Sequence, residues 1–336
     1  MKNYIKALSL VICGGFLLLT FGCEKEIVNS SIHNESPVEI NNPPNDFVVN
    51  SIVNPCYAGL FDSIQVHNGL LKFVDMDHLE DVYNCLEYLY EINQQEFEDA
   101  YGHLTLKQMD SMELVVGFNH WEPYEDFEDL FSYSSRREYI ENLIVAFLDQ
   151  DNPDWENDPD DLDDLDETMR TLVNIEGDLI IGSDVVNLIN FQGFEAINNG
   201  MSSERSENCK RWGREITRPM VTSNTRIRHK TKFNGYFPRN TVKGKVVHHR
   251  LRSNGKWRRS RATLYITTSG SRSRDVVNCS TSWQMGSVNG PRNRRSLKTI
   301  RGNWGQDGAY RSGEVGSTAT VGSGSNVFQH HQVIVW

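Results

Sequence analysis

A chain of 336 residues with 38% hydrophobic residues and a net charge of −11 is long enough to bury a sizeable core. Its one long uncharged run covers residues 7–22, which is shorter than the ~20 apolar residues that a membrane-spanning helix needs. These features argue against an integral membrane protein. We expect no transmembrane helix in the mature chain and a soluble remainder.

Residues 1–22 have the layout of a secretory signal, because two lysines precede the apolar stretch ALSLVICGGFLLLTFG. The stretch ends in Thr-Phe-Gly-Cys at Cys23 and switches to charge at Glu24. This border resembles the lipobox of bacterial lipoproteins, which implies that Cys23 carries diacylglycerol and an acylated amine. Two or three acyl chains would anchor the protein at the outer membrane or cell surface. An ordinary cleaved signal with an incidental cysteine is the alternative.

Four cysteines remain after the signal and Cys23 are set aside, and an even number outside the cytoplasm predicts disulfide bonds. Three pairings are possible, and the local one joins each cysteine to its neighbour in the chain. Their spacing fits no metal site, and we expect neither a metal nor a cofactor. The disulfide candidates are Cys56, Cys85, Cys209 and Cys279.

The charges divide the chain into two opposite halves. Residues 24–207 hold 7 Lys and Arg against 41 Asp and Glu, whereas residues 208–336 hold 25 against 4. We therefore expect a flexible tether over 23–50, an acidic and mainly helical domain over 51–207, and a basic β domain over 208–336. The predicted fold class is α+β, with a sandwich-like second domain.

In the acidic half, LLKF at 70–73 is typical of a short strand, and Asp77 with Glu80 predicts a capped helix start. Leu79, Val82, Tyr83, Leu86, Leu89 and Tyr90 then recur at helical spacing. Further helices are expected over 94–101, 105–116 and 136–148, and small hairpins over 173–189.

The lipobox, the NGLLKF strand leading into an acidic helix, EFEDAYG and LVNIEGDLIIG together resemble a group of uncharacterised lipoproteins from Bacteroidetes-type bacteria. The resemblance covers residues 17–190. It implies a surface or periplasmic lipoprotein, and it supplies no catalytic residues because no activity is established for the group.

The basic half alternates as strands do. In RIRHKTKF the cations at 226, 228, 230 and 232 would face one side and Ile227, His229, Thr231 and Phe233 the other. Similar patterns predict strands over 241–252, 261–268, 275–283, 314–321 and 327–335, separated by clusters of Gly, Asn and Ser.

The cations of this half are the first candidates for a binding site. Arginine pairs with carboxylate, phosphate or sulfate and stacks on aromatic rings, and five of the seven tryptophans lie in the same half. Such a surface would attract an anionic polymer or a glycan. The alternative is that the two halves neutralise each other. The anion-binding candidates are Arg226, Arg228, Lys230, Lys232, Arg258, Arg259, Arg261, Arg292, Arg294 and Arg295.

Two other features concern possible metal or acid–base chemistry. The loop 149–167 has 11 carboxylates in 19 residues, but it lacks EF-hand spacing, so we interpret it as a solvated connector rather than a calcium site. The doublets at 248–249 and 330–331 would each place one histidine on either face of a strand. We expect one buried and one exposed imidazole in each.

No spacing typical of a serine hydrolase, a zinc protease, a nucleotide-binding loop or a dithiol motif is present. The preferred hypothesis is therefore a cell-envelope lipoprotein that binds an anionic or glycan-like partner without catalysis. The rivals are an enzyme that degrades polysaccharide or nucleic acid, and a structural envelope protein whose charged halves dock on each other. The oligomeric state is not predicted.

Overall fold

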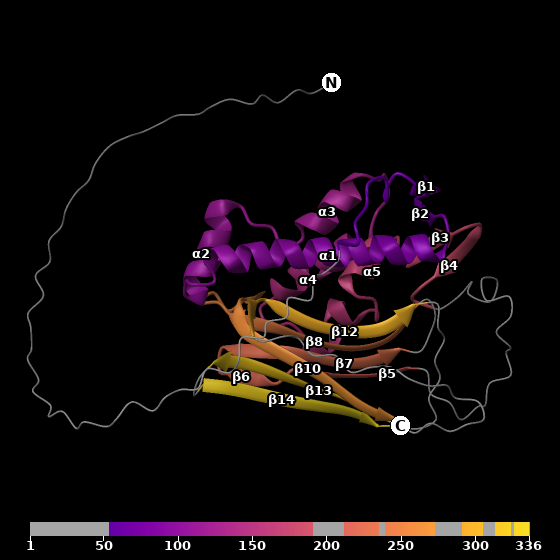
Figure 1. Cartoon of the computed structure of the whole chain (residues 1–336). Helices are drawn as coiled ribbons and strands as arrows, with labels where there is room; N and C mark the ends of the chain where they lie inside the picture. The colour runs from indigo at the N-terminus through magenta and orange to yellow at the C-terminus, as the bar shows by residue number, and fades with distance from the viewer. Residues whose placement is uncertain are drawn as a thin grey trace, which may run out of the picture. The chain divides into compact units, whose positions relative to one another are not determined.

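The computed structural model describes residues 54–190, 212–234, 239–272, 291–304, 313–323 and 326–335. The chain divides into two units, Met1–Ile52 and Val53–Trp336, and every described residue belongs to the second (Figure 1). The predicted signal, Cys23 and the tether lie outside the described residues. So do Cys209, Cys279 and the strand expected over 275–283.

The first half of the described chain is built around one long helix. Its apolar residues repeat every three or four positions, and Leu79, Val82 and Leu86 are fully buried. The helices of this half are α1 (Met76–Tyr101), α2 (Leu106–Val116), α3 (Glu122–Asp129), α4 (Arg136–Leu148) and α5 (Glu167–Thr171), with 3₁₀ turns η1 (Trp155–Asn157) and η2 (Pro159–Asp161).

A small sheet lies beside α1 and shares its core. Its strands run in the order β1 (Gln65–His67), β2 (Leu70–Phe73), β3 (Asp178–Ile181) and β4 (Asp184–Asn187). Asn68 and Gly69 have φ angles of 53° and 77°, which a two-residue hairpin turn between β1 and β2 requires. β2 and β3 are parallel, so the helices between them connect two neighbouring strands.

The second half forms two larger sheets. A six-stranded sheet has the order β12-β8-β7-β5, with β6 paired to β7 and β9 to β8, and a four-stranded sheet has the order β11-β10-β13-β14. The strands are β5 (Trp212–Thr217), β6 (Met220–Thr222), β7 (Thr225–Asn234), β8 (Arg239–Leu251), β9 (Trp257–Arg259), β10 (Ala262–Arg272), β11 (Arg292–Arg294), β12 (Ser296–Trp304), β13 (Gly313–Ser323) and β14 (Asn326–Val335).

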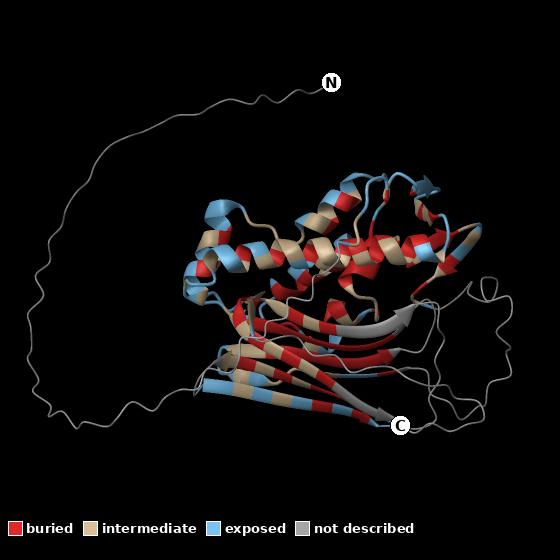
Figure 2. Ribbon diagram, viewed as in Figure 1, coloured by how far each residue is buried: buried red, intermediate tan, exposed pale blue. Residues whose placement is uncertain are grey.

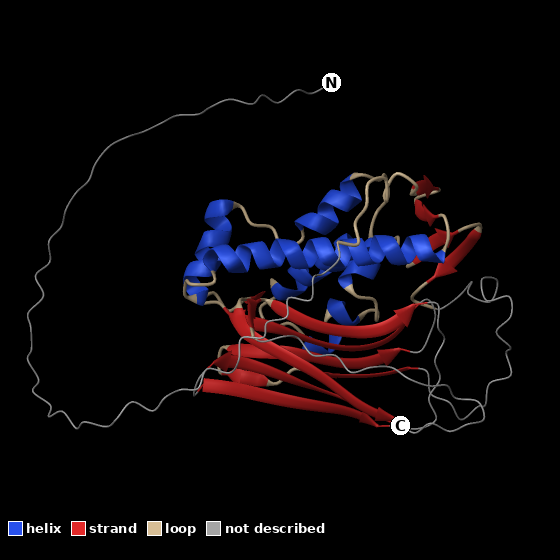
Figure 3. Ribbon diagram, viewed as in Figure 1, coloured by secondary structure: helices blue, strands red, loops and turns tan. Residues whose placement is uncertain are grey.

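These elements stack in three layers, with the helices above the six-stranded sheet and the four-stranded sheet below it (Figures 1 and 3). Apolar side chains fill the space between the two sheets, where Ile227 and Val246 meet Leu264 and Ile266. The opposite face of the six-stranded sheet carries cations that lie under the helices. As a result β7 is buried on both faces (Figure 2), with Phe233 at 0% exposure and Arg228 at 2%.

The structure contains helices and several sheets, which confirms the α+β class. The predicted helices over 105–116 and 136–148 and the strand over 70–73 are present. Two local expectations are wrong: α1 begins after Asp75, whose carboxylate accepts the His78 amide at 2.8 Å, and it continues without a break through 94–101. Asp77 therefore lies inside the first turn rather than at the cap.

Cys56 and Cys85 form a disulfide that ties the segment before β1 to the middle of α1, 29 residues apart. Closing a loop of this length restricts the unfolded chain, which stabilises the fold by about 3.5 kcal/mol. We expect the C56S/C85S variant to lose about this much free energy of unfolding in a urea titration. An unchanged midpoint would contradict that expectation.

Candidate functional site

The predicted anion-binding cations mostly face the acidic half of the chain. Eight of the ten form ion pairs with its carboxylates. For example, Arg294 binds Glu91 and Glu98 of α1 at 2.8 and 3.1 Å, and Arg259 binds Glu141 of α4 at 2.7 Å. The face that these cations form is thus covered by helices.

The two remaining candidates have other partners. Lys232 is buried and donates a hydrogen bond to the backbone oxygen of Asp164. The guanidinium of Arg226 lies 4.4 Å from the ring centroid of Trp155 and 4.9 Å from that of Trp257, so it stacks on two aromatic side chains.

Asp160 is the centre of the ionic contact between the helical layer and the sheet. Its carboxylate is 4% exposed and accepts from Arg170 and Arg228, each at 2.7 Å, and from Lys245 at 3.0 Å. Burial raises the pKa of this carboxyl, but the three cations outweigh it and hold the pKa well below its usual range. The carboxylate therefore stays charged inside the protein.

The expectation of a solvated acidic connector is wrong for the second half of loop 149–167. Asp158, Asp160, Asp163 and Glu167 are all buried. They are buried because the cationic sheet face and two arginines of the helical half, at 136 and 170, pair with them. In the first half of the loop the carboxylates of Asp149, Asp151 and Asp154 are exposed, as expected. No group of metal-ligating side chains occurs within the described residues.

The histidine doublets do not meet. His248 and His249 are both buried, contrary to the expected split, because β8 is covered on both faces: His248 contacts Ser260 and His249 the ring of Trp155. His331 is exposed as expected. His330 instead pairs with His229, with their Nδ1 atoms 2.9 Å apart between the sheets.

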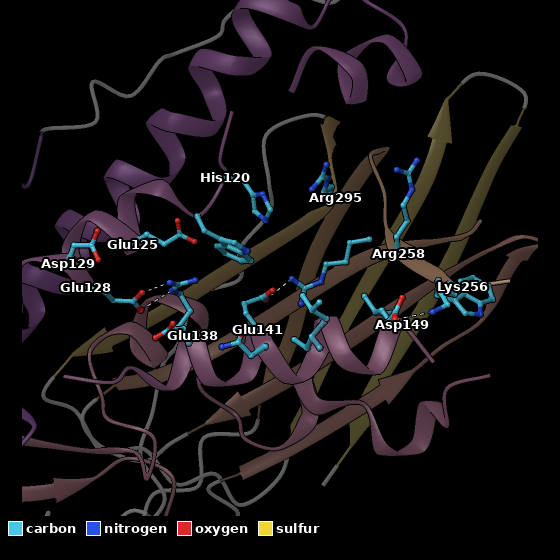
Figure 4. Close-up of a pocket in the computed structure, with 18 of the residues that line it drawn as sticks. His120, Glu125, Glu128, Asp129, Glu138, Glu141, Asp149, Lys256, Arg258 and Arg295 are labelled. Carbon is cyan, nitrogen blue, oxygen red and sulfur yellow. Dashed lines mark hydrogen bonds and ion pairs between the residues drawn. The ribbon is translucent and has the colours of Figure 1, made fainter. Parts of the chain in front are cut away.

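A cleft of about 950 Å³ opens between α3, α4 and the hairpin of β8 and β9 (Figure 4). This volume lies within the range of ~300–1,000 Å³ that small-molecule sites occupy. Trp121 and Trp257 both line it, as do charged side chains of both signs. The cleft thus combines aromatic surface with polar groups, as saccharide and small-molecule sites do.

Cations line one part of the cleft. Arg258 of β9 has a side chain 40% exposed and lies 3.7 Å from Asp110, and Arg295 is 33% exposed and shares Glu113 with Arg261. Arg252 forms no ion pair with any described residue. Three cations in this part of the cleft are therefore accessible and incompletely neutralised.

His120 lies beside these arginines and points toward Arg295 (Figure 4). Burial, together with the positive charges of Arg295, Arg259 and two further arginines, lowers its pKa to about 3. The imidazole is therefore neutral at physiological pH. The arginines around it produce a positive potential in this part of the cleft, which favours an anionic group.

Carboxylates line the opposite part. Glu125 and Asp129 come from α3, and Glu138 comes from the first turn of α4 (Figure 4). None of the three forms an ion pair with another residue that the structure describes; Glu125 accepts a hydrogen bond from Asn119 at 2.6 Å. Glu128, by contrast, binds Arg137 at 2.9 Å and is neutralised.

Arg258, Arg259 and Arg295 of this cleft are among the candidates predicted from the sequence, but the side contributed by residues 120–138 is not. Its helix α3 is only eight residues long, so its apolar spacing is limited to one buried pair, Tyr124 and Phe127. Pro123 in the first turn, after Trp121, is the signal that could have located the start of this helix.

No family model matches the sequence, and no curated protein matches it either. Among solved structures, a DUF4848 family protein from Bacteroides thetaiotaomicron aligns over 81% of this chain and 100% of its own. The sequences are 14% identical and the TM-score is 0.18, so this alignment carries no conclusion about fold or activity. None of the described helices combines the length and apolarity needed to span a bilayer.

Proposed function

We propose that this protein binds an anionic or glycan-like partner in the cleft between α3, α4 and the hairpin of β8 and β9. One observation carries the proposal: most predicted cations are covered by helices, but Arg258 and Arg295 remain accessible, and both line a cleft that two tryptophans also line. Guanidinium groups bind carboxylate or sulfate, and indole rings stack on sugar faces.

Replacement of Arg258 by glutamine tests this role. A charge-assisted hydrogen bond is worth about 1.5–3 kcal/mol, so we expect R258Q to weaken the binding of an acidic oligosaccharide at least tenfold by isothermal titration calorimetry. Arg250 is exposed on β8 outside the cleft, and R250Q should bind as the unmodified protein does. If no acidic polymer or oligosaccharide binds even at low salt, the proposal fails.

A degradative enzyme is the second candidate, and the carboxylates Asp129 and Glu138 favour it. Glycoside hydrolysis needs two carboxyl groups beside the bound sugar. If the protein releases reducing ends from a glycan, and E138Q stops this release but still binds the glycan, the cleft is the site of catalysis. Binding without turnover supports the non-enzymatic function.

We also propose that the protein is anchored in the outer membrane or at the cell surface through lipid on Cys23. The border between the apolar run and Glu24 supports this location. Mass spectrometry of the native protein should find an acylated N-terminal cysteine. An unacylated chain released from cells would contradict the anchor.

A further inference from the structure

The cleft has two ends of opposite charge. In Figure 4 the carboxylates Glu125, Asp129 and Glu138 lie together at one end, and Arg295, Arg258 and Lys256 lie toward the other. The two ends come from different layers of the fold. The acidic end is formed by α3 and the first turn of α4, and the cationic end by strands and turns of the β half.

Internal ion pairs do not cancel this separation. Glu141 pairs with Arg259 at 2.7 Å, and Asp149 pairs with Lys256 at 2.9 Å on the side of the cleft where Arg258 lies, so these four side chains are neutralised. Among the residues that the structure describes, the acidic end keeps three carboxylates without a cation.

At the cationic end Arg258, Arg261 and Arg295 share two carboxylates, Asp110 and Glu113. Arg252 adds a further charge without an ion pair among the described residues. This end therefore keeps a net positive charge.

A purely anionic ligand would be repelled by the acidic end, and a purely cationic one by the arginines. A ligand with both charges, placed apart, satisfies both ends. Trp121 and Trp257 line the same cleft, and aromatic side chains provide the stacking surface that pyranose rings use.

We propose that the ligand is a zwitterionic saccharide, in which an amino sugar with a free ammonium group is linked to an acidic sugar. Its ammonium group binds at Glu125, Asp129 and Glu138, and its carboxylate binds at Arg258 and Arg295. This assignment rests on the proposed function, because it names the ligand class of the same cleft.

Three matched tetrasaccharides of alternating glucosamine and glucuronic acid test the assignment. The first has free amines and carboxylates, the second has the amines acetylated, and the third has the carboxylates reduced to alcohols. We expect the full-length protein to bind the first at least tenfold more tightly than either derivative, measured by calorimetry.

Two variants test the acidic end and the cationic end of the cleft separately. D129N/E138Q should lose the preference for the free amine over the acetylated sugar and keep the preference for the carboxylate. R258Q should lose the preference for the carboxylate over the alcohol and keep the preference for the free amine. E156Q, which alters an exposed carboxylate of η1 outside the cleft, is the matched control and should keep both preferences.

The outcomes distinguish the two proposals. If the acetylated sugar binds as tightly as the free amine, the zwitterionic assignment is overturned while binding of an acidic glycan in the cleft stands. If none of the three binds, the proposed function itself fails. Binding of a short zwitterionic peptide in place of every saccharide would overturn the saccharide class.

Discussion

The D160N variant is expected to lose about 3–5 kcal/mol of unfolding free energy, measured by urea denaturation followed by circular dichroism. The carboxylate of Asp160 is buried and accepts from Arg170, Arg228 and Lys245. An amide cannot neutralise these cations, and they would remain buried with less compensation. The loss follows from the uncompensated charge more than from the missing hydrogen bonds.

Two comparisons make this prediction specific. D151N removes an exposed carboxylate from the same loop and should change stability by less than 0.5 kcal/mol, an order-of-magnitude limit for surface sites. K245M combined with D160N removes a cation together with its partner, so the double variant should be less destabilised than the sum of the single variants. Additive losses would show that Asp160 and Lys245 do not interact in solution.

Lowering the pH from 7 to 5 is expected to destabilise the fold through buried histidines. His229 is fully buried, and burial, followed by the neighbouring His330 and His331, lowers its pKa to about 3. Burial likewise holds the pKa of His249 well below the usual value. The unfolded chain takes up these protons near pH 6.5, whereas the imidazole of His229 stays neutral in the folded chain to about pH 3. Stability is therefore present above pH 6.5 and is lost as the pH falls below it, by up to about 2 kcal/mol for His229 at pH 5, and the lowered pKa of His249 adds a loss in the same direction.

The H229Q variant tests the assignment to this residue. Its stability at pH 7 will be lower because hydrogen bonds to Ser317 and His330 are altered. Its further loss between pH 7 and pH 5 should nevertheless be smaller than that of the unmodified protein by up to about 2 kcal/mol. H67Q, which removes an exposed imidazole from β1, should leave the pH dependence unchanged. The same pH dependence in H229Q as in the unmodified protein would contradict the prediction.

The elements that the sequence predicted correctly are those whose signal is local. Alternation in RIRHKTKF located β7 and its two faces, apolar spacing located α4, and α2 was also expected near its observed bounds. The sequence predicts two shorter helices where α1 is continuous, because acidic residues such as Glu91 and Glu98 interrupt the apolar pattern. Both residues bind Arg294 at the interface between the helices and the sheet. From helical periodicity alone, charged residues are expected to face solvent.

The cleft was only partly predictable for the same reason. Arginine clusters at 258–261 and 292–295 were recognised as candidates, but composition does not indicate which guanidinium groups a helix will cover. Glu113 neutralises Arg261 although 148 residues separate them, and Arg258 nearby stays accessible. Which of the two arginines is covered depends on how α2 packs against the sheet. The sequence pattern does not predict this packing.

The ionic contact between the helical layer and the sheet affects how the chain is made. Glu91 and Arg294 are 203 residues apart, so the carboxylates leave the ribosome long before their counter-ions. The first half therefore leaves the ribosome as an acidic segment whose carboxylates lack these counter-ions. Its high net charge should favour solubility until the arginine-rich strands follow.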